Sequence, residues 1–358
     1  MASSMKAQVF YDKEDMRIED RPVPVIADDE VLVKVQAVGI CGSDQAYYYG
    51  ESPLETETGK GPLILGHEVA GEVVEVGKFP GERGLFKVGD RVSVDPVQYC
   101  NACEICAKGY VNLCENKDVI GVSVDGAFTE FVKSKYTGLH KLPESVPYEH
   151  GCLCEPMACA TYALHNMDIV PGQTAVVMGP GPIGLMLVQM VKSAGAGQVI
   201  MVGTRDYRLE LAKKLGADEI INTGDKNSPY YSEDLTASIA SLTDGAFADR
   251  VVTMTGSATA MEQALEISGR RSTVVFFGLP GGDAVVRVPA LPSIFWDKTI
   301  RFSWLAPHTW PAAIDAIARG LVDLSPLVTH KVALDGLEDG IRKLRAREDN
   351  AVKGVMVA

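Results

Sequence analysis

No stretch of this sequence is apolar over anything close to the roughly 20 residues that a membrane-spanning helix needs, so we expect no membrane segment. The opening residues, MASSMKAQVF, lack the apolar core of an export signal, which predicts a cytoplasmic protein. Basic residues are also scarce: 34 Lys and Arg stand against 47 Asp and Glu, a formal net charge of −13. Binding to nucleic acid needs a basic face that neutralises phosphates, so this balance argues against such a partner.

The 358 residues are enough for two domains, taking about 100–200 residues for each. The first part consists of short segments of strand character separated by Gly and Pro, which is typical of an antiparallel, barrel-like domain. We expect strands there at 8–11, 30–38, 66–76, 90–94 and 127–132.

From residue 174 the pattern changes to alternating strands and helices, which predicts an α/β domain with a doubly wound parallel sheet. The expected elements are strands at 174–178, 198–202, 250–253 and 273–277 and helices at 182–194 and 207–215. The last part returns to the first domain, with helices expected at 311–319 and 337–346 and strands at 328–334 and 352–357.

Four of the eight cysteines, Cys100, Cys103, Cys106 and Cys114, fall within fifteen residues. Without an export signal, disulfides are a poor explanation for this crowding. Four thiolates at these separations can instead complete the tetrahedral shell of a structural zinc ion. Because every coordination position would then be filled, we expect no chemistry at this site.

A second set of possible ligands is scattered along the chain: Cys41 in GICGSD, His67 and Glu68 in GHE, and Glu155 in CLCEPMACA. One thiolate, one imidazole and a carboxylate would leave one zinc position open, as catalysis requires. Each piece alone is weak evidence, since a single cysteine is more often a small buried hydrophobe than a ligand.

The segment MGPGPIG carries Gly179, Gly181 and Gly184 between an expected strand and an expected helix. In this context the glycines predict a tight turn that brings a dinucleotide pyrophosphate to the helix N-terminus. Pro180 and Pro182 have no N–H, so the other residues of the turn must supply the hydrogen-bond donors.

Taken together, GICGSD, GHExxG, VGDRV, the four-cysteine segment, the Glu-Pro pair, the glycine turn and TWP…PLVTH cover nearly the whole chain. In this combination the sequence resembles the zinc-containing medium-chain dehydrogenase/reductase family, particularly its polyol (sorbitol-like) and threonine dehydrogenase branches. The resemblance implies a GroES-like β-barrel catalytic domain at 1–156 and 296–358, with a zinc lobe at about 96–116, and a Rossmann domain at 157–295. It also implies two zinc ions per chain, a nicotinamide coenzyme and a homo-oligomer, more often a tetramer than a dimer.

The same resemblance assigns roles to individual residues. Cys41 and His67 would bind the catalytic zinc with either Glu68 or Glu155, and the remaining glutamate would exchange with the first or hold a water. Ser43 would accept the proton of the substrate alcohol, and Asp44 would brace the loop or simply cap a turn. Tyr47 and Trp304 would line the substrate pocket. The residues expected to contact the coenzyme at the glycine turn are Gly179, Gly181, Pro182, Ile183 and Gly184.

Two departures from the family bear on the substrate. Many relatives have a histidine that passes the proton to solvent where this chain has Ala46, so the relay must use water or another group. Sorbitol-type relatives have an arginine near the position of Leu305. A leucine cannot organise a polyol in that way, which argues against sorbitol itself and leaves another polyol, a sugar, a cyclitol-like molecule or a simple secondary alcohol. Threonine or glucose specificity and a non-enzymatic relative are the alternatives.

The coenzyme is indicated by VIMVGTRD. Gly203 lies nineteen residues after Gly184, near the offset of about 20 at which an acid binds the adenosine ribose of NAD. A glycine there leaves room for a 2′-phosphate, which Thr204, Arg205 and Arg208 could bind. The sequence therefore predicts NADP(H). In the alternative, Asp206 turns toward the ribose and the coenzyme is NAD(H).

The other histidines and cysteines match no ligand spacing, and we expect them to be structural. These residues are His140, His150, His165, His308, His330, Cys152, Cys154 and Cys159.

Overall fold

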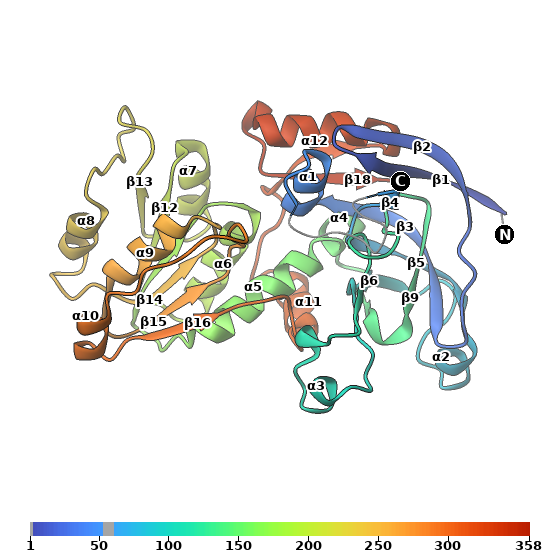
Figure 1. The fold of residues 1–358 in the computed structure, drawn as a ribbon, viewed down its shortest axis with the longest axis horizontal. Helices are drawn as coiled ribbons and strands as arrows, with labels where there is room; N and C mark the ends of the chain where they lie inside the picture. The colour runs from blue at the N-terminus through green and yellow to red at the C-terminus, as the bar shows by residue number, and fades with distance from the viewer. Residues whose placement is uncertain (1–2, 53–60) are drawn as a thin grey trace. The chain divides into compact units, whose positions relative to one another are not determined.

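A computed structural model of the chain describes residues 3–52 and 61–358 (Figure 1). The chain forms two compact units. The first contains Met1–Pro156, Trp310–Ala318 and Leu324–Ala358, and the second contains Met157–Thr309 and Arg319–Asp323. Within the described residues, no helix is long and apolar enough to cross a membrane.

The first unit is built mostly on antiparallel strands. Three of them form a small sheet in the order β2-β1-β4: β1 (Ser4–Asp12), β2 (Asp15–Pro22) and β4 (Leu63–Ile64). A seven-stranded sheet has the order β10-β6-β5-β3-β18-β17, with β9 also pairing with β3. Its strands are β3 (Glu30–Ile40), β5 (Glu68–Val76), β6 (Arg91–Val94), β9 (Phe131–Lys135), β10 (Leu139–Lys141), β17 (Val328–Val332) and β18 (Lys353–Val357).

The register of this larger sheet brings distant segments together. In the ladder between β3 and β5, Gly39 lies opposite Glu68, and in the ladder between β18 and β3, Gly354 lies opposite Ile40. The end of β3, the start of β5 and the start of β18 are therefore neighbours, although they come from the two ends of the chain.

Shorter elements complete the first unit. A two-stranded sheet pairs β7 (Val97–Gln98) with β8 (Asp118–Val119). The helix α12 packs against β17, β18 and α1 (Figure 1). The helices are α1 (Gly42–Tyr48), α2 (Lys78–Glu82), α3 (Glu104–Ala107), α4 (Tyr148–Gly151), α11 (Trp310–Ala318) and α12 (Leu337–Ala346), and α5 (Cys154–Met167) continues from this unit into the second.

One expected strand of this unit is displaced. The sequence predicts a strand at 127–132, but the ladder with β3 runs over Phe131–Lys135. The preceding residues bond elsewhere, because the N–H groups of Ala127 and Phe128 donate to the carbonyls of Gly66 and Leu65. Those bonds hold the segment beside the loop that carries His67.

The second unit is a parallel sheet of six strands in the order β13-β12-β11-β14-β15-β16, the strand order of a Rossmann dinucleotide-binding domain. The strands are β11 (Thr174–Met178), β12 (Gln198–Gly203), β13 (Glu219–Asn222), β14 (Ala248–Thr253), β15 (Ser268–Phe276) and β16 (Thr299–Phe302). The buried faces of these strands are rich in Val, Ile and Met, as expected for strands covered on both sides.

Helices connect the strands of this sheet: α6 (Pro182–Ser193), α7 (Asp206–Lys214), α8 (Leu235–Leu242), α9 (Ala258–Glu266) and α10 (Ala290–Phe295). The helix α6 packs against β11 and β12, and α9 packs against β14 and β15 (Figure 1). The return to the first unit comes at Trp310 rather than at residue 296, because β16 remains with this sheet through its pairing with β15.

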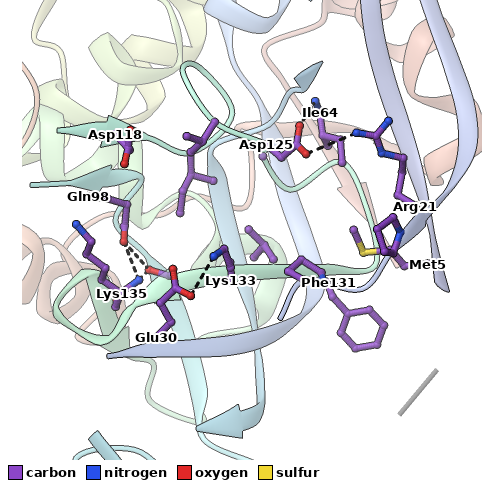
Figure 2. A pocket seen from close by; sticks show the side chains of 17 residues that line it. Met5, Arg21, Glu30, Ile64, Gln98, Asp118, Asp125, Phe131, Lys133 and Lys135 are labelled. Atoms are coloured by element: carbon purple, nitrogen blue, oxygen red, sulfur yellow. Dashed lines mark hydrogen bonds and ion pairs between the residues drawn. The ribbon is translucent and has the colours of Figure 1, made fainter. Parts of the chain in front are cut away.

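The first unit also has a cavity of about 520 Å³ beside β2 and β9. Four of its charged lining residues form two ion pairs: Lys133 Nζ lies 3.0 Å from Glu30 Oε2, and Arg21 Nη2 lies 3.9 Å from Asp125 Oδ2 (Figure 2). None of the residues that line it is among the predicted metal ligands. This cavity is therefore separate from the predicted site.

Candidate active site and zinc centres

Cys41 lies between β3 and α1, at the N-cap of this helix. The backbone N–H of Cys41 donates to Asp44 Oδ2 at 2.7 Å, which fixes the first turn. The sequence did not predict α1, whose seven residues are too few for a clear periodic pattern. The helix positions the Cys41 thiol at the point where β3 ends.

His67 and Glu68 come from the start of β5. The chain turns at Gly66, where φ is +90° and a Cβ would overlap the ring of Phe128, so glycine is required there. One ligand atom from each of Cys41, His67 and Glu68 lies within 4.8 Å of the others. The structure thus brings together three of the four residues predicted to bind the catalytic zinc.

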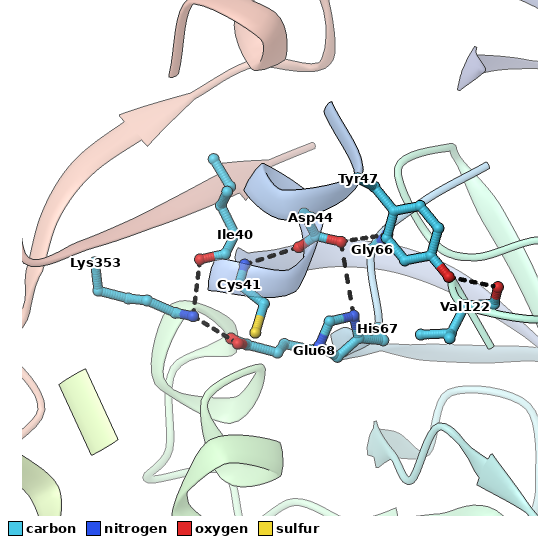
Figure 3. A network of polar contacts seen from close by, with 9 residues as sticks. All are labelled: Ile40, Cys41, Asp44, Tyr47, Gly66, His67, Glu68, Val122 and Lys353. Atoms are coloured by element: carbon cyan, nitrogen blue, oxygen red, sulfur yellow. Dashed lines mark hydrogen bonds and ion pairs between the residues drawn. The ribbon is translucent and has the colours of Figure 1, made fainter. Parts of the chain in front are cut away.

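Asp44 holds this group in place (Figure 3). In addition to Cys41, its carboxylate accepts a hydrogen bond from the backbone N–H of Gly66 at 3.2 Å and lies 3.6 Å from His67 Nδ1. Both roles considered for Asp44 are present, because it caps the first turn of α1 and braces the loop at Gly66, and its carboxylate also faces the imidazole. A carboxylate behind a metal-binding histidine leaves the other ring nitrogen, Nε2, to the metal.

Lys353 is a part of the site that sequence reasoning missed. Its Nζ lies 2.6 Å from Glu68 Oε1 and donates to the carbonyl of Ile40 at 2.9 Å (Figure 3). Both side chains of the ion pair are buried, at 4% and 1% exposure. The only signal in the sequence is a lysine in an otherwise apolar final strand, because lysine is almost never buried without a partner.

The charges around His67 fit a cation. Burial alone lowers the pKa of this imidazole, but the Cys41 thiolate and the carboxylates of Asp44 and Glu155 raise it well above its usual value. Glu68 Oε2 is also buried without a hydrogen-bond partner among the described residues. A thiolate, an imidazole and a carboxylate are the donor set of a catalytic zinc site.

Glu155 lies in the first turn of α5. Its charge raises the pKa of His67. The pKa of Asp95 reaches about 7, mainly because this carboxyl is buried and to a smaller extent because of the Glu155 charge. Glu155 therefore lies near the site without belonging to the tight group that Cys41, His67 and Glu68 form.

Ser43 is half-buried on α1, two residues after Cys41. Tyr47, on the same helix, is buried, and its hydroxyl donates to the carbonyl of Val122 at 3.3 Å. Its ring packs edge-on against Phe10. These contacts are structural, and a role of Tyr47 in substrate binding stays a prediction. Trp304 belongs to the second unit, where it lines an apolar cavity of about 420 Å³ with Phe276 and Phe302.

The four clustered cysteines form the second metal centre. Their sulfur atoms all lie within 4.8 Å of one another. Backbone N–H groups of Ala102 and Cys103 donate to Cys100 Sγ and lower the pKa of this thiol to about 6. Burial and the neighbouring thiols instead raise the pKa of Cys106 to about 12, so four thiolates at this distance need a cation between them. Zinc fits this set, with every position filled by sulfur.

His140 and the three cysteines outside the metal centres have structural surroundings. His140 stacks on Trp310 with ring centroids 4.8 Å apart, and burial lowers its pKa to about 4. Cys152, Cys154 and Cys159 are buried. The expectation that these three cysteines pack rather than bind metal agrees with this burial.

The glycine turn has the predicted strand–turn–helix arrangement. It follows β11, and α6 begins with Gly181 as N-cap and Pro182 as the first residue. Gly179 has φ +113°, and a Cβ on Gly184 would overlap the Gly179 carbonyl, so both positions require glycine. The N-terminus of a twelve-residue helix is suited to a pyrophosphate.

At the other side of the coenzyme site, Gly203 is the last residue of β12 and Arg205 is the N-cap of α7. The exposed Arg205 guanidinium donates to the carbonyl of Thr204 at 3.2 Å. Asp206 Oδ1 accepts hydrogen bonds from Asn222 Nδ2 at 2.6 Å and from Ser228 Oγ at 2.7 Å. The Asp206 carboxylate is thus held toward β13 and the loop after it.

A Rossmann unit joined to an antiparallel unit with one closed and one open zinc site defines a zinc-dependent dehydrogenase that uses a nicotinamide coenzyme. Comparison with known proteins agrees. The family described as "Alcohol dehydrogenase GroES-like domain" matches residues 27–144, and the family described as "Zinc-binding dehydrogenase" matches residues 182–319. The chain belongs to the zinc-containing medium-chain alcohol dehydrogenase family.

Individual relatives match at least 90% of the chain. Sorbitol dehydrogenase of Bacillus subtilis is 36% identical over 356 residues, 99% of this chain and 97% of that protein. L-threonine 3-dehydrogenase of Symbiobacterium thermophilum is 36% identical over 330 residues, 90% of this chain and 89% of that protein. The crystal structure of a zinc-binding dehydrogenase of Sinorhizobium meliloti, bound to NADP, has a TM-score of 0.88 at 28% identity and covers 100% of both chains.

Proposed function

We propose that this protein transfers hydride between NADP(H) and a secondary alcohol or its ketone, with a polyol, sugar or cyclitol-like molecule as substrate. The observation that carries the proposal is the grouping of Cys41, His67 and Glu68 in a chain whose β12 ends without an acid. The grouping of the three ligands supports the chemistry, and the missing acid at the end of β12 supports the choice of coenzyme.

Cys41, His67 and Glu68 would hold the catalytic zinc, with Glu155 nearby to exchange with Glu68 or to hold a water. A zinc ion there supplies Lewis acidity that makes a substrate hydroxyl easier to deprotonate. Ser43 accepts the proton, and Asp44 keeps the imidazole oriented. A bound nicotinamide would supply the hydride acceptor, and loss of hydride from the carbinol carbon would give the ketone. Because Ala46 has no titratable group, the proton would leave Ser43 through water or another group.

NADP(H) is the better coenzyme for the β12 end. An acid that binds the ribose of NAD would repel a 2′-phosphate, and Gly203 provides none. Asp206 could replace that acid only by giving up its bonds to Asn222 and Ser228. The exposed guanidinium of Arg205 can instead make charge-assisted hydrogen bonds to the phosphate, with the Thr204 hydroxyl beside it.

Replacing Arg205 with alanine is expected to raise the Kd for NADPH by about 10–100-fold, since a hydrogen bond to a charged group contributes about 1.5–3 kcal/mol. The Kd for NADH should change by less than about threefold. Quenching of protein fluorescence measures both. Arg271→Ala, at an exposed arginine of the same unit, is the matched control. An unchanged Kd for NADPH in Arg205→Ala would remove the phosphate contact from the proposal.

The substrate is tested with the wild-type enzyme and a panel of polyols, sugars, inositols and simple secondary alcohols, with L-threonine and glucose included. The identity to a threonine dehydrogenase makes threonine the second candidate. Deuterium at the carbinol carbon should appear on the reduced nicotinamide. If L-threonine is oxidised with the highest kcat/KM of the panel, the polyol assignment is wrong and the hydride chemistry stands.

The second unit offers a surface for a second copy of this chain. Four large apolar side chains within twelve residues are exposed: Leu291 at 62%, Ile294 at 72%, Phe295 at 75% and Phe302 at 73%. They lie on α10 and β16, and β16 is the edge strand of the parallel sheet. An exposed apolar patch beside an open strand edge is typical of an interface, so we place a homo-oligomer contact here, within a tetramer.

The double variant Ile294→Asp/Phe302→Asp is expected to dissociate this contact, because two buried charges without partners cannot be accommodated. Light scattering coupled to size-exclusion chromatography should show a lower mass than for the wild type. Val25→Asp is the control, since this apolar side chain is 88% exposed in the other unit. An unchanged mass in the double variant would exclude this surface as the interface.

The cysteines favour a reducing compartment, and we propose the cytoplasm. All eight are free in the structure. Thiolate zinc ligands and buried free thiols are compatible with cytosolic conditions, which keep cysteines reduced.

A further inference from the structure

Pro180, in the glycine turn, occupies the space next to Gly203 at the end of β12. A Cβ built on Gly203 would lie 2.6 Å from both Cδ and Cγ of Pro180, and 3.2 Å from Leu209 Cδ2. Real Cβ atoms do not approach other heavy atoms as closely as 2.6 Å. Any side chain at position 203 therefore requires Pro180 to move, whereas the flexible end of Leu209 can shift by a few tenths of an ångström.

Pro180 is not free to move aside. Its ring fixes φ, so it cannot leave the contact by a rotamer change as a flexible side chain would. The residue before it is tied to the strand itself, because the Gly179 N–H donates to the Val202 carbonyl at 2.8 Å. The next residue, Gly181, is the N-cap of α6. Displacing the ring would thus disturb the turn that receives the pyrophosphate.

We infer that Pro180 is a specificity-determining residue, which bars a ribose-binding acid from position 203 and so keeps the coenzyme site open to a 2′-phosphate. The inference rests on the proposed function, in which Arg205 binds that phosphate. Two segments would then determine the choice of coenzyme together. The end of β12 supplies Gly203, and Pro180 in the glycine turn prevents the replacement of Gly203 by an acid.

A consequence is that an acid at position 203 cannot convert the enzyme to NAD(H) by itself. Gly203→Asp should bind both NADH and NADPH at least tenfold more weakly than the wild type, because the side chain displaces the turn. Pro180→Ala removes the Cγ and Cδ atoms that the new Cβ would meet. The double variant Pro180→Ala/Gly203→Asp should therefore bind NADH at least tenfold more tightly than Gly203→Asp, while NADPH stays weak through charge repulsion.

The uncharged pair Gly203→Ala and Pro180→Ala isolates the steric effect. Gly203→Ala should lower the Tm of the coenzyme-free protein and weaken both coenzymes alike, and adding Pro180→Ala should restore at least half of each loss. A double-mutant cycle measures this coupling, since residues in contact are not additive. Pro182→Ala/Gly203→Asp is the matched control, because Pro182 is not among the atoms nearest to a Cβ at 203, and it should restore nothing.

Two measurements test the inference: fluorescence titration with NADH and NADPH, and thermal unfolding of the coenzyme-free variants. The inference is overturned if Gly203→Asp alone binds NADH as tightly as the double variant, or if the Tm changes of Gly203→Ala and Pro180→Ala simply add. The proposed coenzyme is judged separately, on the wild type: tighter binding of NADH than of NADPH there overturns the NADP assignment. The coupling between positions 180 and 203 is still measured in that case.

Discussion

Replacing Lys353 with methionine is expected to destabilise the protein by about 3–5 kcal/mol when the catalytic zinc is absent. The Lys353 ammonium lies 2.6 Å from Glu68 Oε1, and both side chains are almost completely buried. Methionine fills a similar volume but carries no charge, so the Glu68 carboxylate would remain buried without its partner. A buried charge that loses its partner costs far more than an exposed one.

Urea unfolding in a Cys41→Ala background, which we expect to lack the catalytic zinc, measures this loss. The double replacement Lys353→Met/Glu68→Gln should recover at least half of it, because a neutral amide needs no counter-ion. Lys343→Met is the control: Lys343 pairs with Asp339 on the exposed face of α12, and such pairs contribute at most about 1 kcal/mol. Equal losses for Lys353→Met and Lys343→Met would show that the buried pair has no special role.

Cys41→Ala itself is expected to remove one of two zinc ions per chain and to lower kcat by at least about 1,000-fold, since Lewis acid stabilisation contributes several kcal/mol. The remaining zinc should stay with the four clustered cysteines, which share no residue with the Cys41 group. Metal analysis and initial rates on the same sample test both effects together.

Cys159→Ala provides the matched control, because Cys159 is a buried cysteine outside both metal centres. We expect it to keep two zinc ions and most of the activity. If Cys41→Ala retained two zinc ions per chain, the assignment of the catalytic metal to this group would be wrong.

The parts of the site that could be predicted from the sequence are those that depend on short spacings. Cys100, Cys103, Cys106 and Cys114 are close in the chain and close in space. The glycine turn was likewise predictable, because its strand, turn and helix are consecutive. In both cases local spacing is enough to fix which atoms can meet.

The contacts that were missed depend on pairing between distant strands. Lys353 meets Glu68 because β18 pairs with β3, and β3 pairs with β5. No local pattern contains that register. The contact between Pro180 and Gly203 was missed for the same reason, since it depends on how closely the glycine turn approaches the end of β12.

The domain boundary near residue 296 was misplaced for a related reason. The four residues of β16 are too few to show a period, and only their pairing with β15 assigns them to the parallel sheet. The strand expected at 127–132 was similarly displaced, because its apolar residues are held by backbone bonds to the loop around Gly66. In each case tertiary pairing decided what local preference left open.

We expect hydride to pass between a secondary alcohol and NADP(H). The most direct test is the kcat/KM of the wild-type enzyme for NADP⁺ and for NAD⁺, measured with its best secondary alcohol at saturation. We expect NADP⁺ to be preferred by at least about tenfold, which corresponds to about 1.4 kcal/mol. Equal values, or a preference for NAD⁺, would show that NADP(H) is not the preferred coenzyme.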